Sequence, residues 1–323
     1  MTGWTRLGLA GLVALTAGCL GATTESSAPI DLSAPGSWRM HAPMLTARQE
    51  VAVAALDGRV YVIGGFGPRM SPVATVEAYD PATNEWESRA PLPEPTHHAA
   101  AAVADGRLFV VGGFTGGRVG WSASPTVYEY DSRRNAWITR VPMPTPRGAL
   151  AVAAVGGRLY ALGGGAEEVT NAHEVYDPAA DRWSIANPMP TARDHLAAVA
   201  WQGRVWALGG RRSFTGTQYA NVEVYDPATD SWRTGPPLPT GRGGLAAAAL
   251  GDRILVFGGE APFRIFNATE MYEAAANRWI AKAPMPTARH GIGAAVVGGT
   301  VYLPGGGRQP GFAATRINEA YTP

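Results

Sequence analysis

Residues 193–234 read RDHLAAVAWQGRVWALGGRRSFTGTQYANVEVYDPATDSWRT. The stretch contains an Arg, an Ala- and Val-rich run, an apolar run that ends in Gly-Gly, a Glu-x-Tyr-Asp segment and a Trp. The same landmarks recur along the chain, with Gly-Gly pairs beginning at 64, 112, 163, 209, 258 and 305 and tryptophans at 38, 86, 137, 183, 232 and 279. A period of roughly 46 to 51 residues, sustained six times, predicts a propeller or another array of repeated units.

Each repeat predicts four short strands. The first is rich in Ala and Val, as in Val51–Ala55, Ala99–Val103 and Leu196–Ala200. A tight turn such as Asp57-Gly58 leads into the second strand, a continuous apolar run that ends at the glycines. The third carries Glu-x-Tyr-Asp and the fourth carries the Trp. Apolar runs on both faces of a strand are expected where sheets stack around an axis.

The Gly-Gly, Tyr-Asp and Trp landmarks at these spacings resemble the kelch repeat family, and the resemblance covers residues 37–323. It implies an all-β, six-bladed propeller with four antiparallel strands in each blade. The last unit ends at Tyr321 with no Trp strand after it, while Trp38 precedes the first unit. We therefore expect the N-terminal strand around Trp38 to close the last blade.

The composition excludes several classes of partner and site. The net charge of +1 gives no electrostatic case for nucleic acid. The only cysteine is Cys19, so no disulfide can form within the chain and no cysteine is left for a metal site in the repeats. Hydrophobic residues make up 46% of the chain and charged residues 16%, which indicates a folded core and not disorder.

The first 19 residues have the character of an export signal. Arg6 precedes the apolar run Leu7–Ala17, which is too short for a stable bilayer anchor. Residues 15–19, LTAGC, resemble a bacterial lipobox in which Cys19 would receive lipid, although Thr16 stands where leucine is commonest. An ordinary cleaved secretory signal is the alternative.

These features predict three parts of the chain. Residues 1–19 form the export signal, residues 20–36 a flexible tether and residues 37–323 a single propeller. We expect a bacterial, extracytoplasmic monomer. It is either a lipoprotein anchored to the outer membrane or cell surface, or a secreted protein.

One set of loops carries the length variation between repeats. In every complete unit the strand-three Tyr and the Trp are seven residues apart, whereas 13 to 18 residues separate the first Gly of the Gly-Gly pair from that Tyr. Only the loops between the second and third strands therefore change. Because strands alternate in direction, these loops share one face with the loops that lead into each blade. Variable loops on a rigid scaffold usually carry function, so we expect the ligand on this face.

An Arg begins the first strand of five units, and a Glu lies two residues before the Tyr in five units. The second unit has Thr96 in place of the Arg and Tyr128 in place of the Glu, so both exceptions fall in the same unit. This coincidence favours a buried ion pair within each blade. A ring of anion-binding arginines at the channel mouth is the alternative. The predicted pairs are Arg48–Glu77, Arg147–Glu174, Arg193–Glu223, Arg242–Glu270 and Arg289–Glu319.

Candidate ligand-binding residues lie at the channel mouth and in the variable loops. His98 and His195 stand where kelch repeats often have histidine, which favours a structural role, and His97 and His98 are expected to point to opposite faces of a strand. A metal site would need ligands from units two and four, which are not neighbours, so we expect no metal and no cofactor. The candidates are Glu50, His97, Asp194, His195 and His290 at the mouth, with Trp121, Arg212 and Phe214 in the loops.

Two classes of function fit this arrangement. The first is a binding module that holds a glycan or a protein partner outside the cytoplasm. The second is an enzyme. Kelch propellers of the galactose oxidase type use a tyrosine cross-linked to cysteine, and Cys19 lies in the signal region, so that copper chemistry is not supported. The N-acetylneuraminate epimerases, which are sugar mutarotases, resemble this chain at the fold level and would need a proton-transferring group near an Arg. We expect the binding module.

Overall fold

The computed structural model describes Met1, residues 34–117 and residues 120–323. The export signal and Cys19 lie outside the described residues. The described residues from Ala34 to Pro323 form one compact unit. The carbonyl of Pro35 accepts hydrogen bonds from the Tyr321 hydroxyl (3.0 Å) and the Ala283 amide (2.8 Å), which holds this residue against the last two blades.

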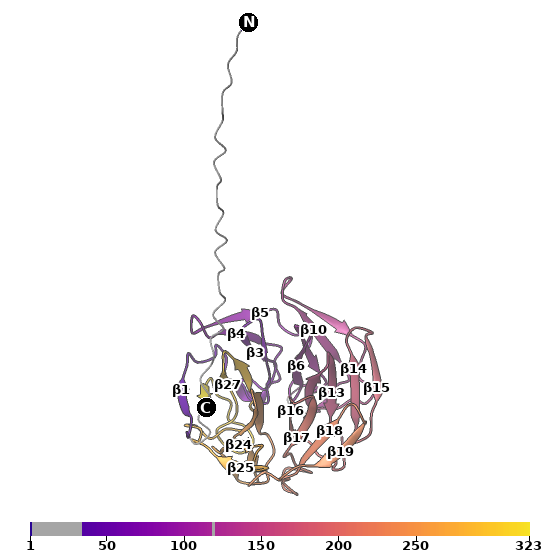
Figure 1. Cartoon of the computed structure of the whole chain (residues 1–323), viewed down its shortest axis with the longest axis vertical. Helices are drawn as coiled ribbons and strands as arrows, with labels where there is room; N and C mark the ends of the chain where they lie inside the picture. The colour runs from indigo at the N-terminus through magenta and orange to yellow at the C-terminus, as the bar shows by residue number, and fades with distance from the viewer. Residues whose placement is uncertain (2–33, 118–119) are drawn as a thin grey trace. The chain divides into compact units, whose positions relative to one another are not determined.

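Six sheets of four antiparallel strands surround a common axis, which confirms the predicted fold class (Figure 1). The first three blades are β2 (Ala52–Leu56), β3 (Arg59–Ile63), β4 (Val76–Asp80) and β5 (Glu85–Arg89); β6 (Ala100–Ala104), β7 (Arg107–Val111), β10 (Val127–Asp131) and β11 (Ala136–Arg140); and β12 (Ala151–Val155), β13 (Arg158–Leu162), β14 (His173–Asp177) and β15 (Arg182–Ile185).

The last three blades are β16 (Ala197–Trp201), β17 (Arg204–Leu208), β18 (Val222–Asp226) and β19 (Ser231–Thr234); β20 (Ala246–Leu250), β21 (Arg253–Phe257), β24 (Thr269–Glu273) and β25 (Arg278–Ala281); and β26 (Ala295–Val297), β27 (Thr300–Pro304), β28 (Asn318–Thr322) and β1 (Ser37–Met40). The loops between second and third strands add the short hairpins β8 (Phe114–Thr115) with β9 (Ser122–Ala123) and β22 (Glu260–Ala261) with β23 (Arg264–Ile265), and the 3-10 turn η1 (Pro68–Met70). The described residues contain no helix with the length and apolar character needed to span a bilayer.

The N-terminal strand closes the ring, as the sequence predicts. β1 pairs antiparallel with β28, and Trp38 faces Tyr321 in that register. The first and last strands of the propeller therefore pair in the sixth blade, where β1 supplies the outer strand that the repeat lacks (Figure 1).

The constant landmarks join each blade to the one before it. The Trp86 indole N–H donates to the Ala42 carbonyl (2.8 Å), and the Ala42 amide donates to Asn84 (2.9 Å), whose side chain also accepts from the Tyr79 hydroxyl (2.8 Å). These bonds hold the turn after the third strand at one length. The other five indoles make the same inter-blade bond, from Trp137 to Ala90, Trp183 to Val141, Trp232 to Asn187, Trp279 to Pro236 and Trp38 to Ala283.

The core is divided into six hydrophobic clusters, each shared by two neighbouring blades. Alanines of the first strands and apolar residues of the second strands supply much of each cluster. A blade has no core of its own, so its stability depends on the blades on either side.

The landmark arginines all form buried ion pairs with the glutamates assigned to them. The nitrogen–oxygen distances run from 2.5 Å in Arg193–Glu223 to 3.1 Å in Arg48–Glu77, and all five arginine side chains are 0% exposed. Each guanidinium also donates to backbone carbonyls of the same blade, as Arg289 does to Leu303 and Gly305. Buried in this way, the guanidinium groups are not available to an anion at the channel mouth.

Six residues form a closed backbone ring around the axis. Each amide donates to the carbonyl of the equivalent residue in the preceding blade, at 2.8 to 3.1 Å, and the amide of Glu50 closes the circle on the carbonyl of Gly291. All six have a φ between 50° and 62°, in the left-handed region. We call this the axial ring; its members are Glu50, His98, Ala149, His195, Gly244 and Gly291.

The axial ring moves the start of each inner strand. Residue Val51 follows the left-handed Glu50, whose amide and carbonyl bond to other blades and not to its own sheet. The strand therefore begins at Ala52, one residue later than the sequence predicts, and the second and fourth blades show the same shift.

Candidate functional site

The axial ring carries three polar side chains, Glu50, His98 and His195. The other three members are Ala149, Gly244 and Gly291, which leave space at the axis. At Gly291 this space is used, because a Cβ atom there would lie 2.4 Å from the Glu50 carboxylate. The small residues of the ring thus allow the large ones to lean across the axis.

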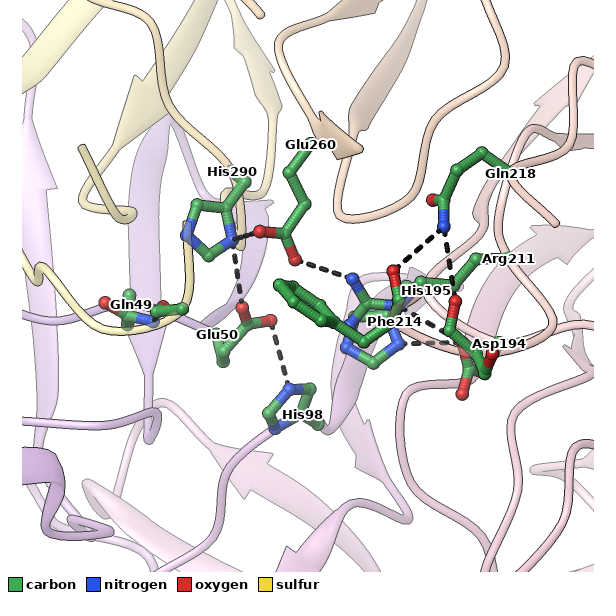
Figure 2. Close-up of polar contacts among 12 residues, drawn as sticks. Gln49, Glu50, His98, Asp194, His195, Arg211, Phe214, Gln218, Glu260 and His290 are labelled. Carbon is green, nitrogen blue, oxygen red and sulfur yellow. Dashed lines mark hydrogen bonds and ion pairs between the residues drawn. The ribbon is translucent and has the colours of Figure 1, made fainter. Parts of the chain in front are cut away.

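A continuous chain of polar contacts extends from Glu50 (Figure 2). One carboxylate oxygen lies 3.3 Å from His98 Nε2 and the other 3.4 Å from His290 Nδ1. That imidazole nitrogen is also 3.5 Å from Glu260, whose other oxygen accepts from Arg211 at 2.6 Å.

The contacts continue from Arg211 to the fourth blade. Its Nε lies 3.7 Å from Asp194 Oδ1, and this oxygen is 2.9 Å from His195 Nδ1. The His195 and His98 rings meet edge to face with centroids 5.0 Å apart. The network therefore returns to its start and surrounds the axis. We call these seven residues, Glu50, His98, Asp194, His195, Arg211, Glu260 and His290, the axial cluster.

Burial and charge give the groups of the cluster different protonation behaviour. Burial raises the pKa of the Glu50 carboxyl, but the surrounding imidazoles, above all His98, hold that pKa well below its usual range. Burial lowers the pKa of His98 to about 4 against the opposing effect of Glu50. For His290 the burial effect is outweighed by Glu50 and Glu260, so its pKa is raised. At neutral pH the site holds an ionised carboxylate between a neutral imidazole and one with a raised pKa.

Aromatic side chains stand beside the cluster. Trp121, Phe214 and Phe312 come from the variable loops of the second, fourth and sixth blades, and each is 40 to 42% exposed. The Trp121 ring packs on Phe66, with centroids 5.1 Å apart, and Phe66 also contacts Phe312. Phe214 packs against the Arg211 guanidinium, 5.4 Å from its ring centroid.

These elements enclose a cavity of about 1130 Å³ on the face that carries the variable loops and the loops entering each blade. The cluster lines it, and so do the three exposed aromatic rings and Arg212. Concave sites with apolar walls and a few convergent polar groups are the usual form of small-molecule sites, and this volume is slightly above their usual range of about 300–1,000 Å³.

The structure brings together seven of the eight predicted ligand-binding residues. These are Glu50, Asp194, His195, His290, Trp121, Arg212 and Phe214.

The exception is His97, which is 0% exposed and stacks on Phe66 with centroids 4.0 Å apart. His98, for which the sequence favours a structural role, lines the cavity instead. The expectation that adjacent histidines point to opposite faces is also wrong here. His98 adopts a φ of 53°, which breaks the strand alternation, and the Nδ1 atoms of the two rings lie 2.6 Å apart.

The premise that units two and four cannot share ligands is wrong as well. Those blades are not neighbours around the rim, yet His98 and His195 meet at the axis. Six blades converge on a ring of six residues, so positions two blades apart at the rim are within side-chain reach at the centre.

Sequence reasoning also missed Arg211 and Glu260 as members of the cluster. Each directly follows a Gly-Gly pair. Each also forms an isolated antiparallel bridge with the residue that follows the landmark Arg of its blade: Arg211 with Asp194, and Glu260 with Gly243. The separation is 17 residues in both cases, as it is for Gln49 with Phe66 and His97 with Phe114. This constant offset is the signal that could have placed them at the mouth.

Comparison with known proteins agrees with this architecture. Residues 36–189 match the family model of the KLHDC2/KLHL20/DRC7 kelch-repeats domain, and residues 192–239 match the kelch motif. The chain is 28% identical over 138 residues to Kelch-like protein 26 of Danio rerio, a match that spans 43% of this chain and only 22% of that protein.

A solved structure, that of YjhT, superposes with a TM-score of 0.74 over 85% of this chain and 95% of its own, at 17% identity. At that identity the likeness concerns the fold alone. The two family-model matches, together with six four-stranded blades in register with the Gly-Gly, Tyr-Asp and Trp landmarks, show that the chain belongs to the kelch-repeat β-propellers.

Proposed function

We propose that this propeller is an extracytoplasmic binding module whose axial cavity holds a carbohydrate. The observation that carries the proposal is the combination of exposed aromatic rings and a polar floor in one cavity. Sugar rings present C–H faces that pack on aromatic side chains and hydroxyl groups that pair with carboxylates, imidazoles and guanidinium groups. Both kinds of partner are available to a single ligand here.

The charge of the floor favours a neutral sugar. Glu50, Asp194 and Glu260 supply three carboxylates, and Arg211 is already engaged with two of them. Arg212 also lines the cavity but stands in an exposed loop. An anionic ligand would therefore meet a floor of largely negative charge, whereas hydroxyl groups can donate to the same carboxylates.

The localisation in this proposal rests on the sequence. A lipid on Cys19, or cleavage of the export signal, would place the propeller outside the cytoplasm. A binding module for glycans fits such a location, and a protein partner on the same face is the other possibility left by the sequence.

The test is a screen of neutral and acidic sugars against the purified chain, followed by calorimetric titration of any hit. Trp121→Ala and Phe214→Ala should each weaken binding by roughly 2- to 10-fold, the worth of one aromatic contact, without lowering the melting temperature. Phe263→Ala is the matched control. It removes an 86% exposed aromatic ring from the loop of the fifth blade, outside the residues that line the cavity, and should leave affinity unchanged.

A screen in which no sugar binds would refute the glycan proposal and favour a protein partner. Equal losses in Phe263→Ala and Trp121→Ala would also contradict it, because the effect would not come from the cavity.

A sugar mutarotase is the second candidate, and one observation favours it. Glu50 touches two imidazoles whose pKa values are displaced in opposite directions, a pattern typical of acid–base pairs. The same sugars should therefore be followed by NMR for the rate of anomer exchange. Faster anomer exchange that Glu50→Gln abolishes would support a mutarotase. Sugar binding without faster exchange would support the binding module.

A further inference from the structure

Three side chains of the axial ring bring potential metal ligands together. Glu50, His98 and His195 each offer one donor atom, and the three donors lie within 4.8 Å of one another. His98 Nε2 lies 3.3 Å from a Glu50 carboxylate oxygen. Two imidazoles and one carboxylate form a ligand set typical of Zn²⁺ sites that keep open positions, and of related first-row divalent ions.

Both imidazoles are oriented by a second contact. The Nδ1 of His195 lies 2.9 Å from Asp194 Oδ1, and the Nδ1 of His98 lies 2.6 Å from the Nδ1 of His97. In each ring this contact fixes Nδ1 and leaves Nε2 free for a ligand role. Figure 2 shows His195 with one ring nitrogen toward Asp194 and the other on the side of Glu50. Metal-binding histidines almost always engage their second nitrogen, with a carboxylate, a backbone carbonyl or water as the partner.

The backbone beneath the donors is fixed. The amides of Glu50, His98 and His195 belong to the closed hydrogen-bonded ring, so their Cα positions are set by all six blades. In tetrahedral geometry an ion at about 2.0 to 2.2 Å from each donor needs donors roughly 3.3 to 3.6 Å apart. The donors lie within 4.8 Å of one another, so side-chain shifts on the order of 1 Å would bring them to this spacing without a change in the backbone.

The surroundings favour a cation. The axial cluster contains the three carboxylates of Glu50, Asp194 and Glu260 but a single guanidinium, that of Arg211. The space above the donors opens into the cavity and not into packed core. A bound ion would thus have its remaining coordination positions available to water or to a ligand.

We propose that Glu50, His98 and His195 form a binding site for a first-row divalent transition metal ion, Zn²⁺ foremost. The ion would sit on the propeller axis at the floor of the cavity. The inference is independent of the proposed sugar ligand, because it rests on the donors and their second contacts alone.

The test uses the full chain, free of any affinity tag and dialysed against chelator. Calorimetric titration with Zn²⁺ should show one equivalent bound, and Co²⁺ should give a visible absorption spectrum distinct from that of the hexaaqua ion. Glu50→Gln and His195→Asn should each weaken Zn²⁺ binding by more than about 100-fold, because they remove a ligand and not an outer contact. Asn tolerates the left-handed backbone that His195 requires.

Two further variants separate the site from general effects. Asp194→Asn keeps all three ligands and removes only the contact behind His195, so binding should weaken by about 10- to 100-fold. His41→Gln is the control: it removes a histidine that contacts Tyr79, away from the axis, and should leave affinity unchanged.

A titration without heat, together with a Co²⁺ spectrum equal to that of the free ion, overturns the proposal whatever the variants do. Binding that is equally strong in wild type, Glu50→Gln and His195→Asn overturns it as well, since the ion would then lie elsewhere. Neither result bears on sugar binding, which the separate screen measures.

Discussion

Removal of one partner from the Arg193–Glu223 pair should be among the most destabilising single changes in this protein. Both side chains are buried, at 0% and 5% exposure, with 2.5 Å between nitrogen and oxygen. Arg193→Leu leaves the Glu223 carboxylate with the Thr191 hydroxyl as its remaining partner, and it also removes the donor to the Ala207 carbonyl. Breaking a buried pair in this way typically costs about 3–5 kcal/mol.

Glu223→Leu should cost less than Arg193→Leu. The stranded guanidinium keeps the carbonyls of Thr191 and Ala207 as acceptors, so we expect a loss near the lower end, about 3 kcal/mol. In the double variant neither charge is stranded. Its loss should therefore fall short of the sum of the single losses by roughly 1–3 kcal/mol. The second blade shows that the fold accepts an uncharged pair here, since it has the buried Thr96 and Tyr128.

The assay is equilibrium unfolding in urea, followed by tryptophan fluorescence and circular dichroism to check that the two transitions coincide. Arg204→Leu is the matched control, because Arg204 pairs with Asp226 in the same blade but is 41% exposed. Exposed pairs contribute about 0–1 kcal/mol, so this variant should stay close to wild type. Strictly additive effects, with both single variants near wild-type stability, would refute the reasoning and return the arginines to consideration as an anion-binding ring.

Three further predictions concern closure, pH and localisation. A chain that begins at Leu45 lacks β1 and should melt lower and self-associate, because the edge of β28 is exposed; equal stability and a monomeric state would contradict the role of β1. Burial lowers the pKa of His173 from 6.5 to about 4, so its neutral form stabilises the fold fully above pH 6.5, and about 3 kcal/mol should be lost as the pH falls toward 4. His173→Phe should flatten that part of the pH profile of unfolding, and an unchanged slope would show that other groups cause it. Cys19→Ser should shift the protein from the detergent phase to the aqueous phase or block its processing, whereas unchanged partitioning would count against a lipid anchor.

The sequence determined the fold because the landmarks are local and repeated. Gly-Gly ends each second strand. Within a fixed spacing, as in the first blade, the Tyr donates to the turn Asn, and the turn Asn and the Trp bond to the preceding blade. Six copies in register leave one arrangement, and the orphan Trp38 identifies the strand that closes it. The Arg–Glu partners could also be assigned, because their joint absence from one blade left a correlation in the sequence itself.

Only the tertiary structure decided which side chains share the site. The members of the axial ring are separated by 46 to 51 residues along the chain, and no local pattern says how far each leans across the axis. His97 and His98 exchange their predicted places because a left-handed residue at the ring reverses the alternation of a strand. Convergence of the blades then brings His98 to His195 from two blades away, a distance set by the radius of the closed ring and not by the sequence between them.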